Sequence, residues 1–145
     1  MAECFEIVIF TAGLQDYADW VLDEIDTCKY ISHRLYRQHT TRTKDCYLKD
    51  LSRIGRELKK TIIVDNLAEN FQLQPYNGIM IKSWVGDQND TALFELAPIL
   101  REIVMKRVND VRVALNQFSM QIQEQSEMGL QQYQLSLDPQ LSLDP

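Results

Sequence analysis

The stretch "TIIVDN" (residues 61–66) runs from apolar and β-branched residues straight into an acid and an amide, Asp65 and Asn66. A short apolar run of this composition predicts a buried β-strand. An acid and an amide after a strand are most often a turn or a helix N-cap, and they are also oxygen ligands suited to a hard cation. The stretch alone leaves both interpretations open.

A second apolar run, "FEIVIF" (residues 5–10), ends at the small residues "TAG" (11–13). A Thr hydroxyl beside the backbone N–H groups of small residues is suited to a phosphate, although such a segment is more often only a tight turn. Residues 14–25 follow with apolar side chains at helical spacing, which predicts an amphipathic helix packed on this strand. Those side chains are Leu14, Tyr17, Ala18, Val21, Leu22 and Ile25.

The other segments continue this alternation of strands and helices. "YISHRLYRQ" (30–38) and "GIMIKSW" (78–84) are strand candidates, and helices are predicted over residues 49–60 and 90–107. Such alternation predicts an α/β fold with a parallel sheet covered on both faces, and the ligand site of such a sheet lies at the carboxyl ends of its strands. The apolar face of the first of these helices consists of Leu51, Ile54 and Leu58.

Charge and cysteine content narrow the class of protein. The formal net charge of −6 over 145 residues argues against general nucleic-acid binding, but residues 29–60 hold ten of the 15 Lys and Arg and only three acids. Three cysteines without CxxC spacing predict neither a disulfide framework nor a zinc site. With no signal-peptide pattern and no long apolar run, we expect a cytoplasmic or nuclear protein that is not secreted and has no membrane segment.

Four segments together resemble a family: "FEIVIFTAGLQDYAD", "YLKDLSRIGRELKKTIIVDN", "NGIMIKSW" and "GDQNDTALFELAPIL". They resemble the small C-terminal-domain phosphatases, the NLI-interacting-factor-like branch of the haloacid dehalogenase superfamily, over about residues 3–116. The resemblance implies a haloacid dehalogenase-like (Rossmann-type) parallel sheet with flanking helices. It also implies Mg²⁺-dependent removal of phosphate from phosphoserine or phosphothreonine in proteins, through an aspartyl-phosphate.

The resemblance also assigns roles to single residues. Thr11 matches the hydroxyl that holds a phosphoryl oxygen, and Lys49 matches the lysine that offsets the charge of the carboxylates and the phosphate. Asp65 and Asn66 match the acid–amide pair of the metal site, in which the Asn66 amide oxygen is a Mg²⁺ ligand and Asp65 orients Lys49 and the metal shell. The catalytic residues implied are thus Thr11, Lys49 and Asp65, and the metal residues are Asn66 and Asp65.

Two further matches, Tyr17 and Arg37, fall at positions that line the substrate pocket in the polymerase-tail phosphatases. Without the resemblance, a helical Tyr is usually part of the core and a lone Arg is usually solvated. We expect residues 29–60, Arg37 and Lys49 among them, to form a positive rim near the ends of the strands that bear Thr11 and Asp65.

One motif of the family is missing from the sequence. The family carries Asp-x-Asp-x-Thr at the end of a central strand, where it supplies the nucleophile and the general acid, and residues 1–145 contain no such motif. We therefore expect a domain that lacks its first, central strand and is inactive alone. Either "FEIVIF" and "TIIVDN" pair directly, or a partner chain supplies the missing strand. The alternative function is a non-catalytic phosphoprotein- or partner-binding domain.

The last part of the chain differs in composition. From Phe118 onwards Gln and Ser dominate, and "QLSLDP" occurs at 134–139 and again at 140–145. We divide the chain into a partial phosphatase domain over residues 1–116 and, over residues 117–145, a helix extension followed by a disordered tail.

Overall fold

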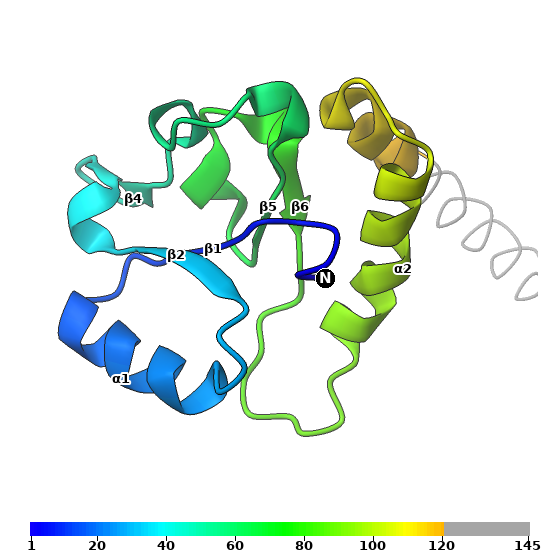
Figure 1. Cartoon of the computed structure of the whole chain (residues 1–145). Coiled ribbons are helices and arrows are strands. Elements are labelled where there is room, and N and C mark those ends of the chain that lie inside the picture. The colour runs from blue at the N-terminus through cyan, green and yellow to red at the C-terminus, as the bar shows by residue number, and fades with distance from the viewer. Residues whose placement is uncertain (121–145) are drawn as a thin grey trace, which may run out of the picture.

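The strands of this chain form two-stranded sheets (Figure 1). The computed structural model describes residues 1–120. The strands and α-helices are, in order, β1 (Ile7–Phe10), α1 (Gln15–Ile25), β2 (Ile31–Leu35), β3 (Thr41–Arg42), β4 (Tyr47–Leu48), β5 (Ile63–Asp65), β6 (Gly78–Met80) and α2 (Ala92–Met105). Short 3-10 turns lie between them: η1 (Arg37–His39), η2 (Leu51–Arg53), η3 (Leu58–Lys60), η4 (Ala68–Phe71) and η5 (Pro75–Asn77). Residues 111–120 are also helical.

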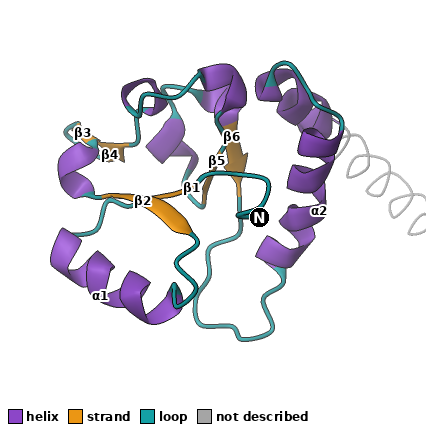
Figure 2. Ribbon diagram, in the orientation of Figure 1, coloured by secondary structure: helices purple, strands orange, loops and turns teal. Residues whose placement is uncertain are grey.

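The α/β class with parallel strands is confirmed. β1 pairs with β2 in parallel and β5 pairs with β6 in parallel, while β3 and β4 form an antiparallel hairpin between the two pairs. Helix α1 provides the crossover from β1 to β2, and the turns η4 and η5 connect β5 to β6 (Figure 2). The polar segment before Lys49, which has no apolar periodicity, thus forms the β3–β4 hairpin.

Direct pairing of β1 with β5 is not found, so this expectation was wrong. Within residues 1–120, β1 pairs only with β2 and β5 pairs only with β6. The four residues of β1 are therefore half-buried rather than buried, although their sequence is that of a strand with two neighbours. In each of the two parallel pairs, both strands keep an outer edge without a strand partner among the described residues, and β1 and β5 each have one such edge.

Helix α1 packs on β1 and β2 with a narrower face than its apolar spacing predicts. Ala18 and Leu22 are buried, whereas Leu14, Tyr17 and Ile25 are all more than 60% exposed. The sheet under α1 has only two strands and is narrower than the predicted apolar face of the helix. The side chains at the edges of that face therefore stay exposed. Its polar side is tied to β2 instead, where the Arg34 guanidinium donates to Asp19 at 3.0 Å.

Residues 49–60 form two 3-10 turns, η2 and η3, and not the expected helix. Gly55 lies between them with a φ of 69°, a left-handed conformation that interrupts a right-handed helix. The predicted apolar face nevertheless forms, because the two turns bring its side chains to one cluster. That cluster consists of Leu51, Ile54, Leu58, Ile63 and Phe71.

The second parallel pair is covered by the C-terminal helices. Ile62 and Ile79, from the β5 and β6 segments, pack against a cluster made by α2 and residues 108–115 (Figure 1). No helix within residues 1–120 is long and apolar enough to cross a membrane. The expected cytoplasmic or nuclear location stays a prediction, and the repeat at 134–145 lies outside the described residues.

Asn77 is the most deeply buried side chain of the described residues, at 1% exposure. Its amide donates hydrogen bonds to the carbonyl oxygens of Leu58 and Thr61, at 2.6 and 2.7 Å. The side chain therefore ties the start of β6 to the chain that leads into β5. A buried amide that satisfies two carbonyl groups is costly to replace, because both acceptors lose their partner.

The exchange Asn77→Asp tests this tie with a side chain of nearly the same shape. A carboxylate at this position would face two carbonyl oxygens in a buried site, so its pKa should be raised. The loss of stability should grow as the pH rises above about 4, where the unfolded chain releases the proton. Urea unfolding at pH 4 and pH 7 measures it; an equal loss at both values would contradict the burial of this group.

Candidate phosphate-binding site

The residues after β1 form a backbone loop around the Thr11 hydroxyl. The Thr11 N–H continues the ladder by donating to Leu35 at 2.8 Å, and the Thr11 Oγ1 accepts a hydrogen bond from the Gly13 N–H at 2.9 Å. A hydroxyl that accepts from the backbone keeps its own proton to donate. Thr11 is half-buried, so this proton is available to an anion that approaches the carboxyl end of β1.

Arg37 is held against the same loop. Its N–H donates to the Gly13 carbonyl at 3.1 Å, its Nε donates to the Ala12 carbonyl at 2.6 Å, and its guanidinium carbon lies 5.0 Å from the centre of the Tyr47 ring. No ion pair within residues 1–120 includes Arg37. Its charge therefore stands at the end of β1 without a carboxylate to neutralise it.

Lys49 and Asp65 form an ion pair at the end of β5. The Lys49 Nζ donates to the Asp65 Oδ2 at 2.5 Å, and the two side chains are 12% and 2% exposed. The other Asp65 oxygen accepts from the Leu67 N–H and from the Asn70 amide, both at 3.0 Å. Burial acts to raise the pKa of Asp65, but the Lys49 ammonium and the Leu67 N–H hold that pKa below its usual value.

Asn66 follows this pair on the exposed side. Its Nδ2 donates to the Ser83 hydroxyl at 2.9 Å, which links the loops that follow β5 and β6. As a magnesium site the described residues are incomplete. Both Asp65 oxygens already accept hydrogen bonds, and residues 1–120 contain no group of three or more His, Cys, Asp or Glu side chains that could hold a metal. They supply the Asn66 amide oxygen and do not fit the ion without further ligands.

Tyr17 lies on α1 and is 66% exposed, so it is not the core residue that a helical Tyr usually is. No hydrogen bond of the described residues holds its hydroxyl in place. Its role in substrate binding stays a prediction.

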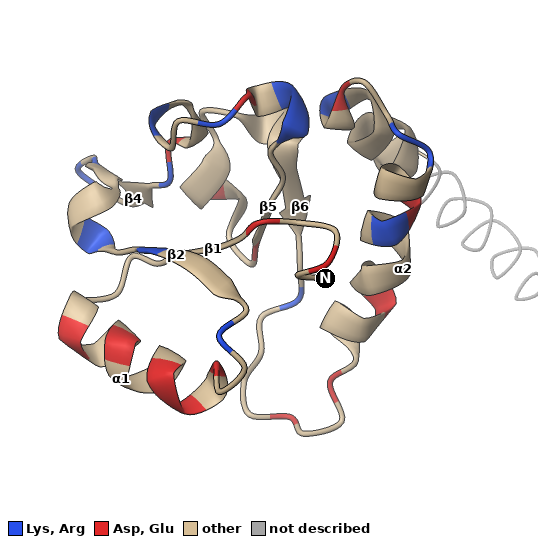
Figure 3. Ribbon diagram, in the orientation of Figure 1, with Lys and Arg blue, Asp and Glu red and all other residues tan. Residues whose placement is uncertain are grey.

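The five other predicted residues fall into two groups at the carboxyl ends of the parallel strands. Thr11 and Arg37 lie at the end of β1, whereas Lys49, Asp65 and Asn66 lie at the end of β5. The positive rim predicted for residues 29–60 is found only in part. Arg37 and Lys49 lie at the carboxyl ends of β1 and β5, but Lys49 is paired with Asp65. Arg56 pairs with Glu6 at the opposite end of β1. Figure 3 shows acidic residues gathered on α1 and basic residues spread over the elements between β2 and β5.

Two residues that contribute to the site, Asn70 and Tyr47, were not identified from the sequence. Asn70 binds Asp65 and accepts the Lys49 backbone N–H at 2.7 Å through its carbonyl oxygen, and Tyr47 carries the Arg37 guanidinium on its ring. Asn70 lies five residues after Asp65, within a turn that spacing does not reveal. Tyr47 begins one of the segments that resemble the family, but neither a motif nor its spacing singles it out.

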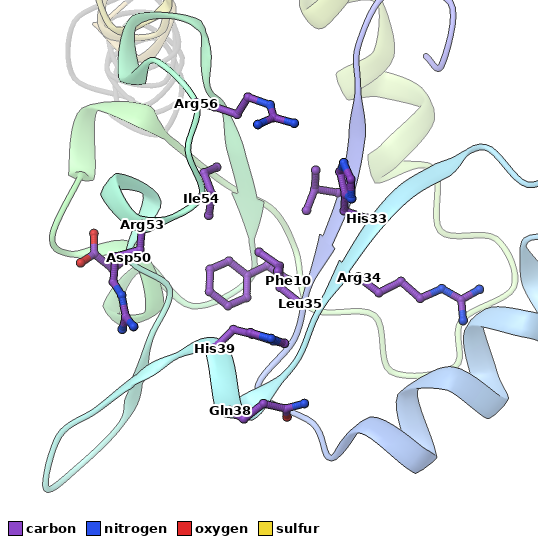
Figure 4. Close-up of a pocket in the computed structure, with 11 residues that line it drawn as sticks. Phe10, His33, Arg34, Leu35, Gln38, His39, Asp50, Arg53, Ile54 and Arg56 are labelled. Carbon is purple, nitrogen blue, oxygen red and sulfur yellow. The ribbon is translucent and has the colours of Figure 1, made fainter.

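An open cavity of about 390 Å³ lies beside the face of β1 on which Val8 and Phe10 project. Figure 4 shows Phe10 and Leu35 of the first strand pair across from Ile54 and Arg53, which precede β5. The cavity therefore lies between the β1–β2 pair and the segment that leads into β5.

Comparison with known proteins decides the family. The profile of the NLI interacting factor-like phosphatases matches residues 1–112. The chain belongs to this family. A Dictyostelium discoideum relative named "Probable C-terminal domain small phosphatase" is 48% identical over 117 residues, which cover 81% of this chain and 38% of that protein.

Two other relatives carry different names. Human "Carboxy-terminal domain RNA polymerase II polypeptide A small phosphatase 2" is 43% identical over 81% of this chain and 42% of its own length. The mouse "Mitochondrial import inner membrane translocase subunit TIM50" is 34% identical over 83% of this chain and 34% of its own length. The chain thus spans about two fifths or less of the length of these relatives.

The Lys49–Asp65 pair predicts an asymmetric response to the loss of a lysine. Lys49→Met should destabilise the fold by about 3 kcal/mol, because it leaves the Asp65 carboxylate buried without its cation. Lys59→Met is the matched control, since Lys59 pairs with Glu57 at the surface and both side chains are at least half exposed. Urea unfolding of both variants measures the difference; equal midpoints would contradict the pair.

The pKa of Asp65 predicts how its contribution depends on pH. A lowered pKa in the folded state means that the ionised Asp65 stabilises the fold above the unfolded-state pKa of about 3.9. That contribution is lost as the pH falls through the folded-state value. The stability difference between the natural chain and Asp65→Asn should therefore be largest above pH 4 and shrink towards pH 2, and a difference constant with pH would refute the assignment.

Proposed function

We propose that the chain carries one part of a protein serine/threonine phosphatase site, and that hydrolysis requires an added strand bearing Asp-x-Asp-x-Thr between β1 and β5. The observation that carries this proposal is the pairing of Lys49 with Asp65 at the end of β5, while Thr11 and Arg37 stand at the end of β1, and each of these two strands has one edge without a strand partner among the described residues. These are the groups that bind a phosphate and offset its charge.

The residues of the chain would act on the substrate by binding and electrostatics. The Thr11 proton and the Arg37 guanidinium suit the oxygens of a phosphoserine or phosphothreonine, because charge-assisted bonds to phosphate are the strong ones. Lys49 keeps two ammonium protons beyond the one given to Asp65, and Asp65 fixes its direction. A positive charge held this way stabilises the charge that develops on a transferring phosphoryl group.

The strand would supply what residues 1–145 lack. A covalent aspartyl-phosphate needs a carboxylate at the phosphorus, and the Asp-x-Asp-x-Thr motif brings one at the carboxyl end of a strand. The unpartnered edges of β1 and β5 offer backbone groups to such a strand. The same motif would add carboxylate oxygens beside Asn66, which is where a magnesium ion would find its missing ligands.

A second function, phosphoprotein binding without hydrolysis, is favoured by the absence of the motif from the sequence. The Arg37 charge and the Thr11 proton would serve it unchanged. Family membership is compatible with it, because a shared fold does not establish a shared activity.

Complementation separates the two functions. The chain in magnesium buffer should not hydrolyse a phosphoserine peptide or p-nitrophenyl phosphate alone. With a synthetic peptide of about ten residues, an apolar β-branched run ending in Asp-x-Asp-x-Thr, turnover should begin, because that length spans a typical strand and the motif. The matched peptide with both Asp replaced by Asn should give none, and Lys49→Ala should abolish the effect.

The outcomes assign the function. Turnover by the chain without peptide that disappears in Lys49→Ala would contradict the need for the strand. Phosphopeptide binding without turnover, with or without the motif peptide, would assign the binding function instead. If the chain shows neither phosphopeptide binding nor turnover, both proposed functions are contradicted.

A further inference from the structure

We infer that Tyr47 is a positioning residue that holds the Arg37 guanidinium for the phosphate of the substrate. This inference rests on the proposed function, because it assigns to Arg37 the phosphate of a phosphoprotein. Tyr47 is half-buried in the β3–β4 hairpin.

Backbone contacts fix most of Arg37 but not the end of its side chain. The Arg37 N–H and Nε donate to the carbonyl oxygens of Gly13 and Ala12, and the Arg37 carbonyl accepts from the Thr40 hydroxyl at 2.6 Å. Those bonds place the residue beside the Thr11 loop. The guanidinium carbon then lies over the Tyr47 ring, 5.0 Å from the ring centre.

Arg37 is held differently from Arg34, Arg56 and Arg112. Arg34, Arg56 and Arg112 donate to carboxylates, which fill the guanidinium fork and neutralise its charge. An aromatic face orients a guanidinium while leaving both its charge and its terminal N–H groups available. A guanidinium held by a ring and by the Ala12 carbonyl is therefore free to bind an anion, whereas one that is paired with a carboxylate is not.

Tyr47 also joins the two groups of the site. Tyr47 begins β4, and Lys49 follows directly after that strand. Lys49 is fixed by Asp65, and Tyr47 is in contact with Arg37. The hairpin thereby sets the distance between the cation at the end of β1 and the cation at the end of β5. Arg42 lies 6.0 Å from the same ring and adds a further positive charge to it.

The test compares Tyr47→Leu, which removes the ring but keeps an apolar side chain, with Tyr47→Phe, which keeps the ring. Affinity of the full chain for a phosphoserine peptide is measured by calorimetry. Tyr47→Leu should weaken binding about fivefold, the equivalent of roughly 1 kcal/mol for a cation–π contact. Tyr47→Phe should stay within about twofold of the natural chain. Tyr30→Leu, at a tyrosine that is 63% exposed, is the control and should bind as the natural chain does.

A second pair of variants separates positioning from folding. If Tyr47 acts through Arg37, then Tyr47→Leu should have no further effect on affinity in the Arg37→Ala background. An effect that persists there, a Phe variant as weak as the Leu variant, or a Leu variant that binds like the natural chain would each overturn the inference.

A ligand-free measurement keeps the inference distinct from the proposed function. If the natural chain binds no phosphoserine peptide, the proposed function fails and the phosphate role of Arg37 fails with it. Hydrogen exchange of the Arg37 Nε–H, followed by NMR in the unliganded chain, then still decides whether Tyr47 holds this side chain. Faster exchange in Tyr47→Leu but not in Tyr47→Phe is expected, and equal exchange in both would contradict the positioning.

Discussion

Backbone hydrogen bonding joins β1 to β2 and β5 to β6, and within residues 1–120 it joins neither pair to the other. A strand edge in the interior of an α/β domain is costly, because each buried N–H or C=O without a partner costs about 1–3 kcal/mol. The four residues of β1 are half-buried, and the cost is smaller for a partly exposed edge than for a buried one. Because the two pairs of strands do not share a sheet, the site is divided between them. The β1–β2 pair carries Thr11 and Arg37, and the β5–β6 pair carries Asp65 and Asn66.

Side-chain contacts connect the two pairs at both ends of β1. At the amino end, the Glu6 carboxylate accepts two hydrogen bonds from the Arg56 guanidinium, at 2.7 and 2.8 Å. At the carboxyl end, Arg37 meets the Tyr47 ring of the hairpin that leads to Lys49. Contacts of this kind at a surface stabilise weakly compared with a shared sheet. The two parts of the site are therefore held beside each other by side-chain contacts. A strand between them would hold them through backbone hydrogen bonds.

Much of this architecture could be predicted from the sequence, and the failures have physical causes. The strands at "FEIVIF" and "TIIVDN" and the Lys49–Asp65 pair were recognisable, because apolar runs and family motifs are local signals. The prediction of a helix over residues 49–60 was wrong because Gly55 takes a left-handed conformation. The helical spacing of the apolar residues does not reveal that conformation. Tyr17 is exposed and β1 is separate from β5 because of the number of strands in each sheet. The periodicity of apolar residues does not predict that number. The Arg37–Tyr47 contact crosses a hairpin and has no signature in spacing.

The central claim is that β1 and β5 accept a strand between them, and backbone hydrogen exchange tests it most directly. Amides of β1 and β5 are followed in the full chain as the peptide bearing Asp-x-Asp-x-Thr is added. The account predicts that exchange slows in both strands together, while α2, which packs on the other side of the β5–β6 pair, keeps its rates. Protection of only one strand, or no change at a peptide concentration that saturates binding, would contradict the account.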